Sequence, residues 1–317
     1  MNKILIGYPL DRHEIFKEIL KPIKKKYETI LKDYTYSWIL NNIHSFEILV
    51  PSIKVKIDNK IMERARNLRF IFTPTTGSDH LSFDREKYTI KVLSLIDFKE
   101  EIYSITSTAE LAFSLVLILS RKIFFAHKNI IQDGKWERNN FLGKELQAKT
   151  LGIMGLGRIG GAAARYASAF GMKVIYWDKE EKKTDYEYIK NLTNLLSTSD
   201  YIICCLNLTP YTEHIINFSN IKNIKKGAIF VNISRGKIVD ELALCYSLEK
   251  GILSGIGSDV LEEELVDFTS SPLYIYAKKH PEANIIITPH IGGATFEAWE
   301  RVFSLIGRKI LKRERLK

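Results

Sequence analysis

The sequence predicts an α/β protein with two Rossmann-like lobes, each a doubly wound parallel sheet, and a cleft between them. Short apolar runs alternate with charged helical stretches in two successive series along the chain, and this alternation indicates parallel βαβ units. The length of 317 residues is sufficient for two domains of about 100–200 residues each. A glycine-rich turn follows the first strand of the second series, where a Rossmann fold bends from strand to helix.

The first series occupies the N-terminal hundred residues. Its apolar runs predict strands at residues 4–6, 46–50, 70–72 and 91–95, and its charged stretches predict helices at residues 12–27 and 58–66. A long apolar helix expected at residues 107–125 separates the two series and forms a natural hinge. We therefore place one domain at residues 1–104.

The second series predicts strands at residues 150–154, 173–177, 201–205, 228–232, 255–259 and 284–288. A last helix, starting near Phe296, comes after this lobe is complete and can pack back on the first one. The second domain is accordingly expected at residues 105–294, with the C-terminal helix 295–317 completing the first domain.

Composition and charge exclude several classes of protein. Lys and Arg exceed Asp and Glu by ten, 47 against 37, but the basic clusters at 24–26 and 312–317 lack the interleaved aromatic residues of a single-strand binding groove. No apolar run approaches the roughly 20 residues of a membrane-spanning helix. Cys204, Cys205 and Cys245 form neither a metal-ligand spacing nor an even disulfide set. We expect a cytoplasmic protein with no nucleic-acid partner, no membrane partner and no metal.

The glycine turn predicts a dinucleotide site. Gly155 would form the tight turn, Gly157 would let the backbone approach a pyrophosphate, and Gly160 would let the helix pack on the strand. The next strand ends in Asp178, 18 residues past Gly160, where a carboxylate accepts both adenosine ribose hydroxyls. A carboxylate repels a 2′-phosphate and no arginine follows at once, so the expected cofactor is NAD.

Ionisable residues follow strands of the second series, at the edge where ligands bind in open α/β sheets. Arg235 stands at a strand end beside a glycine and suits a bidentate carboxylate contact. His290 follows another strand end and precedes two glycines; an imidazole exchanges protons near neutral pH. A carboxylate beside His290 would stabilise its imidazolium form. The residues alone leave open which glutamate of the run 262–264 does this.

The order of motifs resembles the D-2-hydroxyacid dehydrogenase family, which acts on D-isomers of phosphoglycerate, hydroxypyruvate, glycerate and lactate. The resemblance covers nearly the whole chain. The matching segments lie at residues 75–81, 108–110, 134–136, 150–160, 169–172, 232–236, 259–260 and 288–293. Two positions depart from the family pattern, since Leu265 and Asn207 replace prolines that are usual there.

The resemblance implies roles for individual residues. Arg235 would bind the carboxylate and carbonyl of the substrate, and His290 would be the proton donor. Glu264, five residues after Asp259, would be the carboxylate that tunes His290. Asp259 would hold the nicotinamide carboxamide. Further cofactor contacts are implied for Arg158, Ile159, Leu206, Ile233, Ser234 and Gly292, and substrate contacts from the first lobe for Thr76 and Gly77.

The implied activity is NAD-dependent hydride transfer between a D-2-hydroxy acid and a 2-keto acid, of the D-3-phosphoglycerate or the hydroxypyruvate and glyoxylate type. The loop 72–77 contains no arginine that would mark a phosphate pocket. The resemblance also implies a homodimer formed through the long helix and the following arm to residue 143. The alternative is a corepressor-like scaffold that senses dinucleotides on the same fold, and turnover of 2-keto acids with NADH separates the two.

Overall fold

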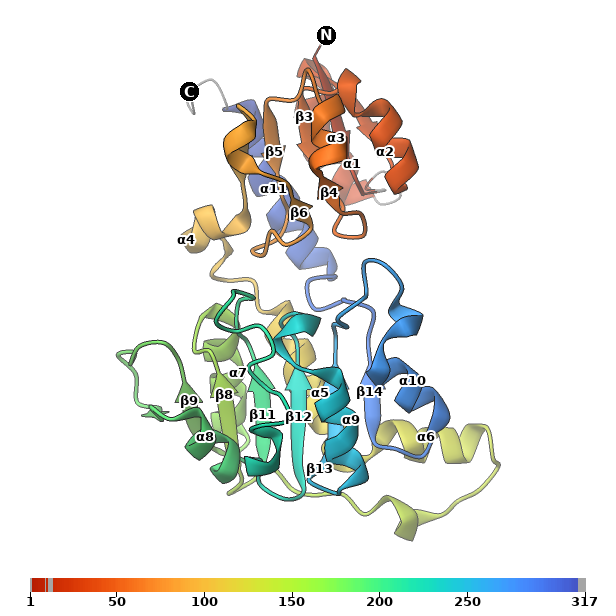
Figure 1. Cartoon of the computed structure of the whole chain (residues 1–317), viewed down its shortest axis with the longest axis vertical. Helices are drawn as coiled ribbons and strands as arrows, with labels where there is room; N and C mark the ends of the chain where they lie inside the picture. Colours follow the sequence, from red (N-terminus) through yellow and green to blue (C-terminus); the bar gives the residue numbers. More distant parts are fainter. Residues whose placement is uncertain (1, 9, 11–13, 313–317) are drawn as a thin grey trace. The chain divides into compact units, whose positions relative to one another are not determined.

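The computed structural model describes residues 2–8, 10 and 14–312 (Figure 1). Its backbone contacts divide the chain into two compact units, Met1–Ile105 together with Thr295–Lys317, and Thr106–Ala294. Each unit is built on a parallel sheet with helices, so the predicted α/β class with two Rossmann-like lobes is confirmed. Residue 12 and most of the basic tail, 313–317, lie outside the described residues.

The first unit contains a five-stranded sheet in the order β2-β1-β3-β5-β7, in which all neighbours are parallel. Alternate residues of β1 serve opposite faces: Ile4 and Ile6 join one apolar cluster, and Leu5 joins the other. The strands are β1 (Lys3–Ile6), β2 (Glu28–Leu31), β3 (Ile48–Val50), β5 (Phe70–Phe72) and β7 (Lys91–Leu93), with the short pair β4 (Ile57–Asp58) and β6 (Leu81–Ser82) beside them.

Helices from both ends of the chain cover the sheet of the first unit. The helices of this unit are α1 (Glu14–Lys26), α2 (Tyr36–Asn42), α3 (Asn59–Arg64), α4 (Lys99–Ile102) and α11 (Phe296–Leu311). Phe16 and Leu20 of α1 share an apolar cluster with Val302 and Ile306 of α11. The last helix therefore supplies part of the core of the N-terminal unit.

The second unit contains a seven-stranded parallel sheet in the order β10-β9-β8-β11-β12-β13-β14. Its strands are β8 (Thr150–Met154), β9 (Lys173–Trp177), β10 (Glu187–Tyr188), β11 (Tyr201–Cys204), β12 (Ala228–Asn232), β13 (Leu253–Ser258) and β14 (Ile285–Ile287). Its helices are α5 (Ser107–Arg121), α6 (Ile123–Ile131), α7 (Arg158–Ala169), α8 (Leu192–Thr198), α9 (Glu241–Glu249) and α10 (Pro272–Lys279). One apolar cluster on each face buries the strands between helices.

The structure corrects the long helix expected at residues 107–125. It breaks at Lys122, whose backbone is left-handed with φ 51°. The Lys122 amide donates to the carbonyls of Ile118 and Leu119 and so closes α5, and α6 starts at the next residue. Among the described residues no single helix is long and apolar enough to span a membrane; one bent pair, Leu95–Ile102 with Ser107–Arg121, reaches that length and composition only together.

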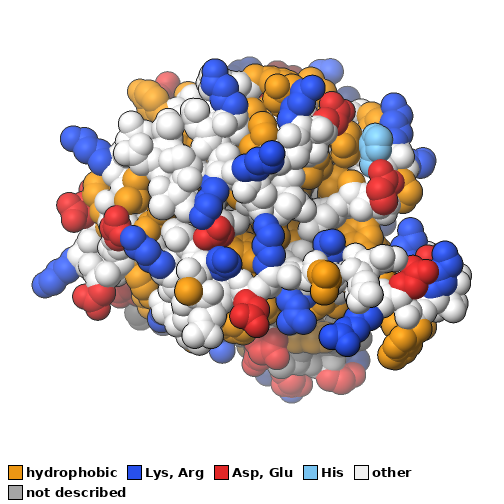
Figure 2. All heavy atoms as spheres, turned by 90° about the horizontal axis from the view of Figure 1, so that it is seen from below, with side chains coloured by type: hydrophobic (Ala, Val, Ile, Leu, Met, Phe, Trp, Pro, Cys, Tyr) orange, Lys and Arg blue, Asp and Glu red, His pale blue; other side chains and the backbone are white. Residues whose placement is uncertain are grey.

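Basic side chains are dispersed on the face of the molecule drawn in Figure 2. Lys and Arg side chains there are separated by acidic, apolar and uncharged groups, and they do not gather into one patch. Within the described ranges no group of three or more His, Cys, Asp and Glu side chains is arranged to hold a metal ion.

The junction of β8 and α7 brings helix and strand backbones into close contact. A Cβ atom added at Gly160 would lie 2.2 Å from the carbonyl oxygen of Gly155, whereas one added at Gly161 would meet nothing within 4 Å. The third glycine of the turn is therefore required by packing, as the sequence predicts.

Substitution of Gly160 with alanine should destabilise the second unit by about 1–3 kcal/mol, because the added methyl overpacks this junction. Gly161→Ala, one residue further in the same helix, should be neutral or stabilising by about 0.5–1 kcal/mol, because alanine favours the helix. Thermal unfolding followed by circular dichroism measures both. Equal midpoints for the two variants would contradict the close packing.

Candidate active site

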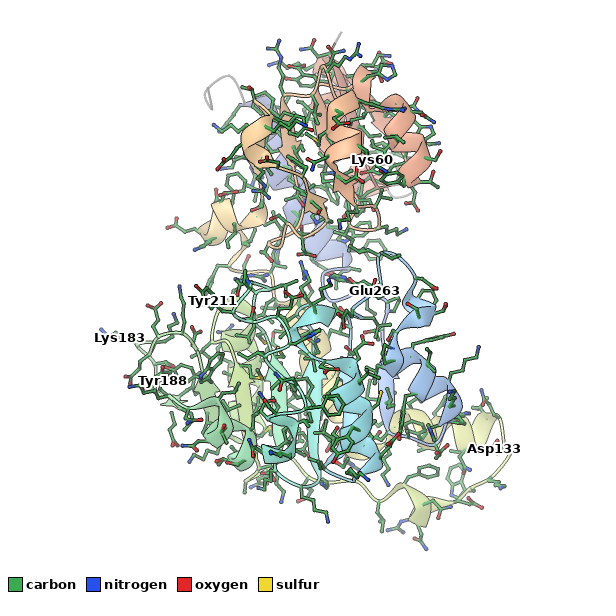
Figure 3. The ribbon with its side chains drawn as sticks, in the orientation of Figure 1. Lys60, Asp133, Lys183, Tyr188, Tyr211 and Glu263 are labelled. Carbon is green, nitrogen blue, oxygen red and sulfur yellow. The ribbon has the colours of Figure 1, made fainter. Side chains whose placement is uncertain are left out.

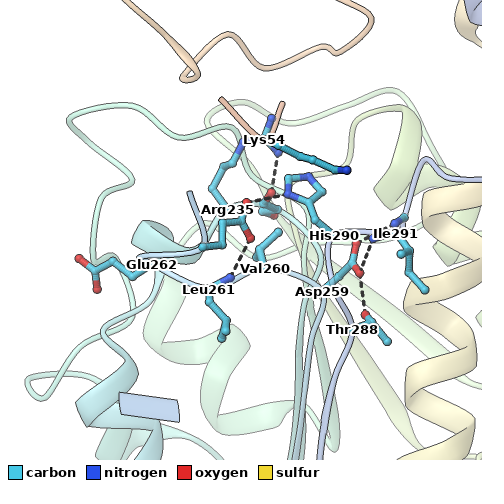
Figure 4. Close-up of polar contacts among 12 residues, drawn as sticks. Lys54, Arg235, Asp259, Val260, Leu261, Glu262, Thr288, His290 and Ile291 are labelled. Carbon is cyan, nitrogen blue, oxygen red and sulfur yellow. Dashed lines mark hydrogen bonds and ion pairs between the residues drawn. The ribbon is translucent and has the colours of Figure 1, made fainter. Parts of the chain in front are cut away.

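Three side chains of interest follow neighbouring strands of the second unit. Arg235 comes after β12, Asp259 directly after β13 and His290 after β14, and these strands are adjacent in the sheet. Because parallel strands end at the same edge, the turns that carry these residues meet there. Figure 4 shows this edge, with Arg235, Asp259 and His290 labelled.

Asp259 holds the turn that carries His290. Its side chain is 1% exposed. Its Oδ1 accepts hydrogen bonds from Thr288 Oγ1 at 2.6 Å and from the Ile291 amide at 2.8 Å, and its Oδ2 accepts from the Gly292 amide at 2.7 Å. Burial, the largest influence, raises the pKa of Asp259 from its ordinary value, and these hydrogen bonds act in the opposite direction. Both carboxylate oxygens are thus committed to the turn.

The backbone of His290 is left-handed, with φ 53°. This conformation costs a non-glycine residue roughly 1–2 kcal/mol. The amide of His290 donates to the carbonyls of Asp259 and Thr288, at 2.9 and 3.0 Å. Together with the Asp259 side chain, these bonds fix the direction in which the imidazole leaves the turn.

Glu264 is the glutamate that pairs with His290. Its Oε1 lies 2.6 Å from His290 Nδ1, and its Oε2 accepts the Leu261 amide at 3.0 Å. Both side chains are partly buried, with 20% of Glu264 and 27% of His290 exposed. Of the two other candidates, Glu262 pairs instead with His214, at 3.2 Å. The structure therefore selects one glutamate where the residues alone left three.

Arg235 lies on a braced turn. Asn232, buried at the end of β12, accepts the Ser234 amide at 3.1 Å and donates to the Arg235 carbonyl at 3.0 Å. A Cβ atom added at Gly236 would lie 2.1 Å from the carbonyl carbon of Leu261. The turn that carries Arg235 is thus packed directly on the loop that carries Glu264.

A buried glutamate that the sequence analysis did not single out anchors this loop. Glu241, at the start of α9, is 3% exposed. Its Oε1 accepts the Glu262 amide at 2.9 Å, and its Oε2 accepts the Ser271 hydroxyl and, at 3.3 Å, the Leu273 amide. It therefore joins the loop after β13 to the start of α10. In the sequence Glu241 resembles any acidic residue in a first helical turn, so no local signal reveals it.

The glycine turn fits a dinucleotide. Gly155 has φ +94°, which favours glycine, and the space beside Gly157 is open. Gly157 caps α7 without a side-chain hydrogen bond, so the first amides of this 12-residue helix are directed out of its N-terminus. Such an end attracts phosphate oxygens.

Asp178 stands at the end of β9 beside this turn. Its side chain is 14% exposed, and its Oδ2 accepts the Leu156 amide at 2.9 Å. This hydrogen bond fixes the carboxylate to the glycine turn through Oδ2, one of its two oxygens.

Most of the other predicted residues lie in the second unit, and two lie in the first. Arg158 and Ile159 open α7, Leu206 follows β11, and Gly292 closes the turn held by Asp259. Ser234 is buried with its hydroxyl donated to the Cys204 carbonyl at 2.7 Å, so it also supports the sheet edge, and Ile233 is buried beside it. Thr76 and Gly77 lie in the first unit on the loop after β5, where Thr75 donates to the Gly77 carbonyl at 2.6 Å.

Comparison with known proteins gives consistent matches. The family model described as "D-isomer specific 2-hydroxyacid dehydrogenase, NAD binding domain" matches residues 113–292. A hydroxypyruvate reductase of Thermotoga maritima is 36% identical over 98% of this chain and 97% of its own length. A glyoxylate reductase of Pyrococcus furiosus is 34% identical over 86% of this chain and 81% of its own.

Solved structures agree with these matches. The D-lactate dehydrogenase of Aquifex aeolicus, solved in complex with NAD and lactic acid, superposes with a TM-score of 0.83 at 27% identity. The match covers 98% of this chain and 96% of that one. None of these matches favours a dinucleotide-sensing scaffold.

Proposed function

Because this chain belongs to the D-isomer specific 2-hydroxyacid dehydrogenase family, we propose that His290, Glu264 and Arg235 are its catalytic residues. The chain is an NAD-dependent oxidoreductase that interconverts a D-2-hydroxy acid and a 2-keto acid. The observation that carries the assignment is the Glu264–His290 pair, 2.6 Å apart at the carboxyl edge of the sheet.

His290 acts as the proton donor during reduction. Glu264 holds Nδ1 of the ring, which leaves Nε2 to face the carbonyl oxygen of the keto acid. The carboxylate stabilises the protonated ring, as an acid for carbonyl reduction requires. In the reverse direction the neutral ring takes the proton of the alcohol.

Arg235 binds the substrate through its guanidinium. A planar fork of donors suits the carboxylate and the adjacent carbonyl of a 2-keto acid and polarises that carbonyl. Asn232 donates a hydrogen bond to the Arg235 carbonyl. This bond fixes the backbone from which the guanidinium extends. Thr76 and Gly77 are proposed to contribute backbone contacts to the substrate carboxylate from the N-terminal unit.

The glycine turn and Asp178 bind NAD, with the pyrophosphate at the N-terminus of α7 and the adenosine ribose at the carboxylate. The bound nicotinamide supplies or accepts the hydride. Residues Met1–Ile105 with the C-terminal helix form the substrate domain in this proposal, and Thr106–Ala294 form the coenzyme domain.

We expect small, unphosphorylated keto acids as substrates, and reduction of glyoxylate or hydroxypyruvate above all. The relatives named as reductases of these two acids support this expectation, as does the absence of arginine from the loop 72–77. Loss of NADH absorbance with a panel of 2-keto acids measures it. Turnover of 3-phosphohydroxypyruvate above glyoxylate and hydroxypyruvate would contradict the substrate class.

Removal of the imidazole should lower kcat without loss of coenzyme binding. We expect His290→Ala to reduce kcat by about 10²–10⁴-fold, the usual contribution of general acid catalysis, with the Kd for NADH unchanged. His280→Ala, at the exposed end of α10, is the matched control and should keep wild-type kcat. A kcat for His290→Ala within a few-fold of wild type would disprove the proton-donor role.

Neutralising the partner of His290 should have a smaller effect. We expect Glu264→Gln to lower kcat for reduction by about 10- to 100-fold, because a hydrogen bond to a charged group contributes about 1.5–3 kcal/mol. Glu263→Gln removes the same charge one residue earlier and should keep the wild-type kcat. A kcat for Glu264→Gln equal to that of Glu263→Gln refutes the pairing.

A homodimer is proposed from the arm that follows α5. Helix α6 buries no residue of its own within the described chain, and Figure 3 labels Asp133 just after the end of this helix. Large apolar side chains on α6 and the arm are exposed: Ile123 51%, Phe124 50%, Ile130 42%, Ile131 67%, Trp136 85% and Leu142 72%. Exposed apolar side chains of this kind favour a contact with a second copy of the chain.

Charges placed on this arm should dissociate the dimer. We expect the double variant Ile131→Glu, Trp136→Glu to sediment as a monomer in analytical ultracentrifugation, with the wild type at twice its mass. Tyr211→Glu changes an equally exposed aromatic, 92% exposed, on the loop after β11 (Figure 3) and should stay dimeric. A dimer that survives the double change would place the interface elsewhere.

A cytoplasmic location stays a prediction. None of the three cysteines forms a disulfide, which suits a reducing compartment. Burial also raises the pKa of Cys245 to about 12, so this thiol is chemically inert.

A further inference from the structure

A series of side-chain hydrogen bonds runs through the loop 73–80, which leads from β5 to β6 in the first unit (Figure 1). His80 and Thr73 are 2% and 1% exposed, and Nε2 of the His80 ring lies 2.9 Å from Thr73 Oγ1. Thr73 Oγ1 lies 2.8 Å from Thr75 Oγ1, which donates to the Gly77 carbonyl at 2.6 Å. None of these three side chains has a part in the proposed proton transfer.

The hydroxyl hydrogens fix the direction of this series. A carbonyl oxygen can only accept, so the single hydroxyl hydrogen of Thr75 is donated to Gly77. Thr75 must then accept from Thr73, whose own hydroxyl hydrogen is used in that bond. Thr73 in turn accepts from His80, so the imidazole carries a hydrogen on Nε2. Each bond in such a series polarises the next one and strengthens it.

Backbone hydrogen bonds hold both ends of the series. The Thr73 amide donates to the carbonyl of Leu93, the last residue of β7, at 2.8 Å. The His80 carbonyl accepts the amide of Ile57, the first residue of β4, at 2.8 Å. The imidazole and the Thr73 hydroxyl therefore extend from backbone positions that are themselves fixed by the strands of this unit.

We propose that His80 is a positioning residue for the substrate, and that it acts through the two threonine hydroxyls to hold the Gly77 carbonyl in one orientation. The proposal rests on the proposed function, in which the backbone of Thr76 and Gly77 contacts the substrate carboxylate. His80 itself touches neither substrate nor coenzyme in this proposal. Its effect is on how well the loop binds the keto acid.

The orientation of the Gly77 carbonyl matters because the substrate is an anion. A carboxylate is attracted by amide hydrogens and repelled by carbonyl oxygens. Glycine has no Cβ atom, so the peptide group beside it turns more freely than at other residues. Without the bond from Thr75, the Gly77 carbonyl is free to turn toward the carboxylate and repel it. The series that starts at His80 keeps this oxygen bound to the protein.

Matched substitutions in the full-length chain separate the hydrogen bond of His80 from its volume, because Met and Gln are similar in length and only Gln has an Nε2 donor. We expect His80→Met to raise the KM for glyoxylate about 5- to 20-fold, the effect of a lost hydrogen bond, with kcat and the Kd for NADH unchanged. The Kd of oxamate, an unreactive analogue of glyoxylate, should rise equally in the complex with NADH. His80→Gln should restore both constants, and His44→Met, at an exposed histidine of the same unit, should change neither.

The Thr75 hydroxyl gives an independent test at a less buried position. Thr75→Val keeps the shape of the side chain and removes the donor to Gly77, so it should raise the KM by a similar factor. Thr75→Ser keeps the hydroxyl and should stay near the wild-type KM. The double variant His80→Met, Thr75→Val should raise the KM no further than Thr75→Val alone, because residues of one hydrogen-bond network are not additive.

An unchanged KM in both His80→Met and Thr75→Val overturns the proposal, and so do additive effects in the double variant. A His80→Gln variant as impaired as His80→Met shows a role in packing alone and overturns it as well. Arg235→Ala separates these failures from failure of the proposed function. If Arg235→Ala raises the KM and the loop variants do not, only the role of His80 is refuted. If Arg235→Ala also leaves the KM unchanged, or if the wild type reduces no 2-keto acid, the proposed function is refuted and this proposal with it.

Discussion

The hydrogen bonds to the buried carboxylate of Asp259 are the interaction on which the site depends. They hold Thr288, Ile291 and Gly292 around a left-handed His290, a conformation that an unconstrained chain seldom adopts. Burial of a carboxylate without hydrogen-bond partners would strongly destabilise the folded state. Here both carboxylate oxygens accept hydrogen bonds from the turn. These bonds offset the cost of burial, and they also fix the direction in which the imidazole points.

The same arrangement recurs one loop away and makes the site a connected unit. Glu241, also buried, holds the Glu262 amide and the start of α10, while Gly236 packs against Leu261. Glu264 is therefore positioned by contacts on both sides of its loop. Two internal carboxylates without catalytic roles of their own thus determine where the Glu264–His290 pair meets, which explains how short, irregular loops can hold a 2.6 Å contact.

Local sequence patterns predicted the elements whose own residues determine their structure. They did not predict the features that depend on packing against other parts of the chain. Strands 150–154 and 173–177 have the predicted bounds, because an unbroken apolar run between polar residues suits a strand buried on both faces. Strand β2 was not predicted, since Glu28–Leu31 has no buried residue at the sheet edge. The break at Lys122 has no glycine or proline to announce it. Glu241 acts through hydrogen bonds to the Glu262 and Leu273 amides, which are distant in the sequence, and a linear pattern cannot show such contacts.

The joining of α1 and α11 in one core has a consequence for biosynthesis. Chains leave the ribosome from the N-terminus at about 5–20 residues per second, so the N-terminal unit emerges first but lacks Val302, Phe303 and Ile306 until those residues have been synthesised. The intervening unit, Thr106–Ala294, is continuous and can complete its fold earlier. For about 10–40 s the nascent N-terminal segment therefore exposes the apolar face of α1 that α11 covers in the folded chain.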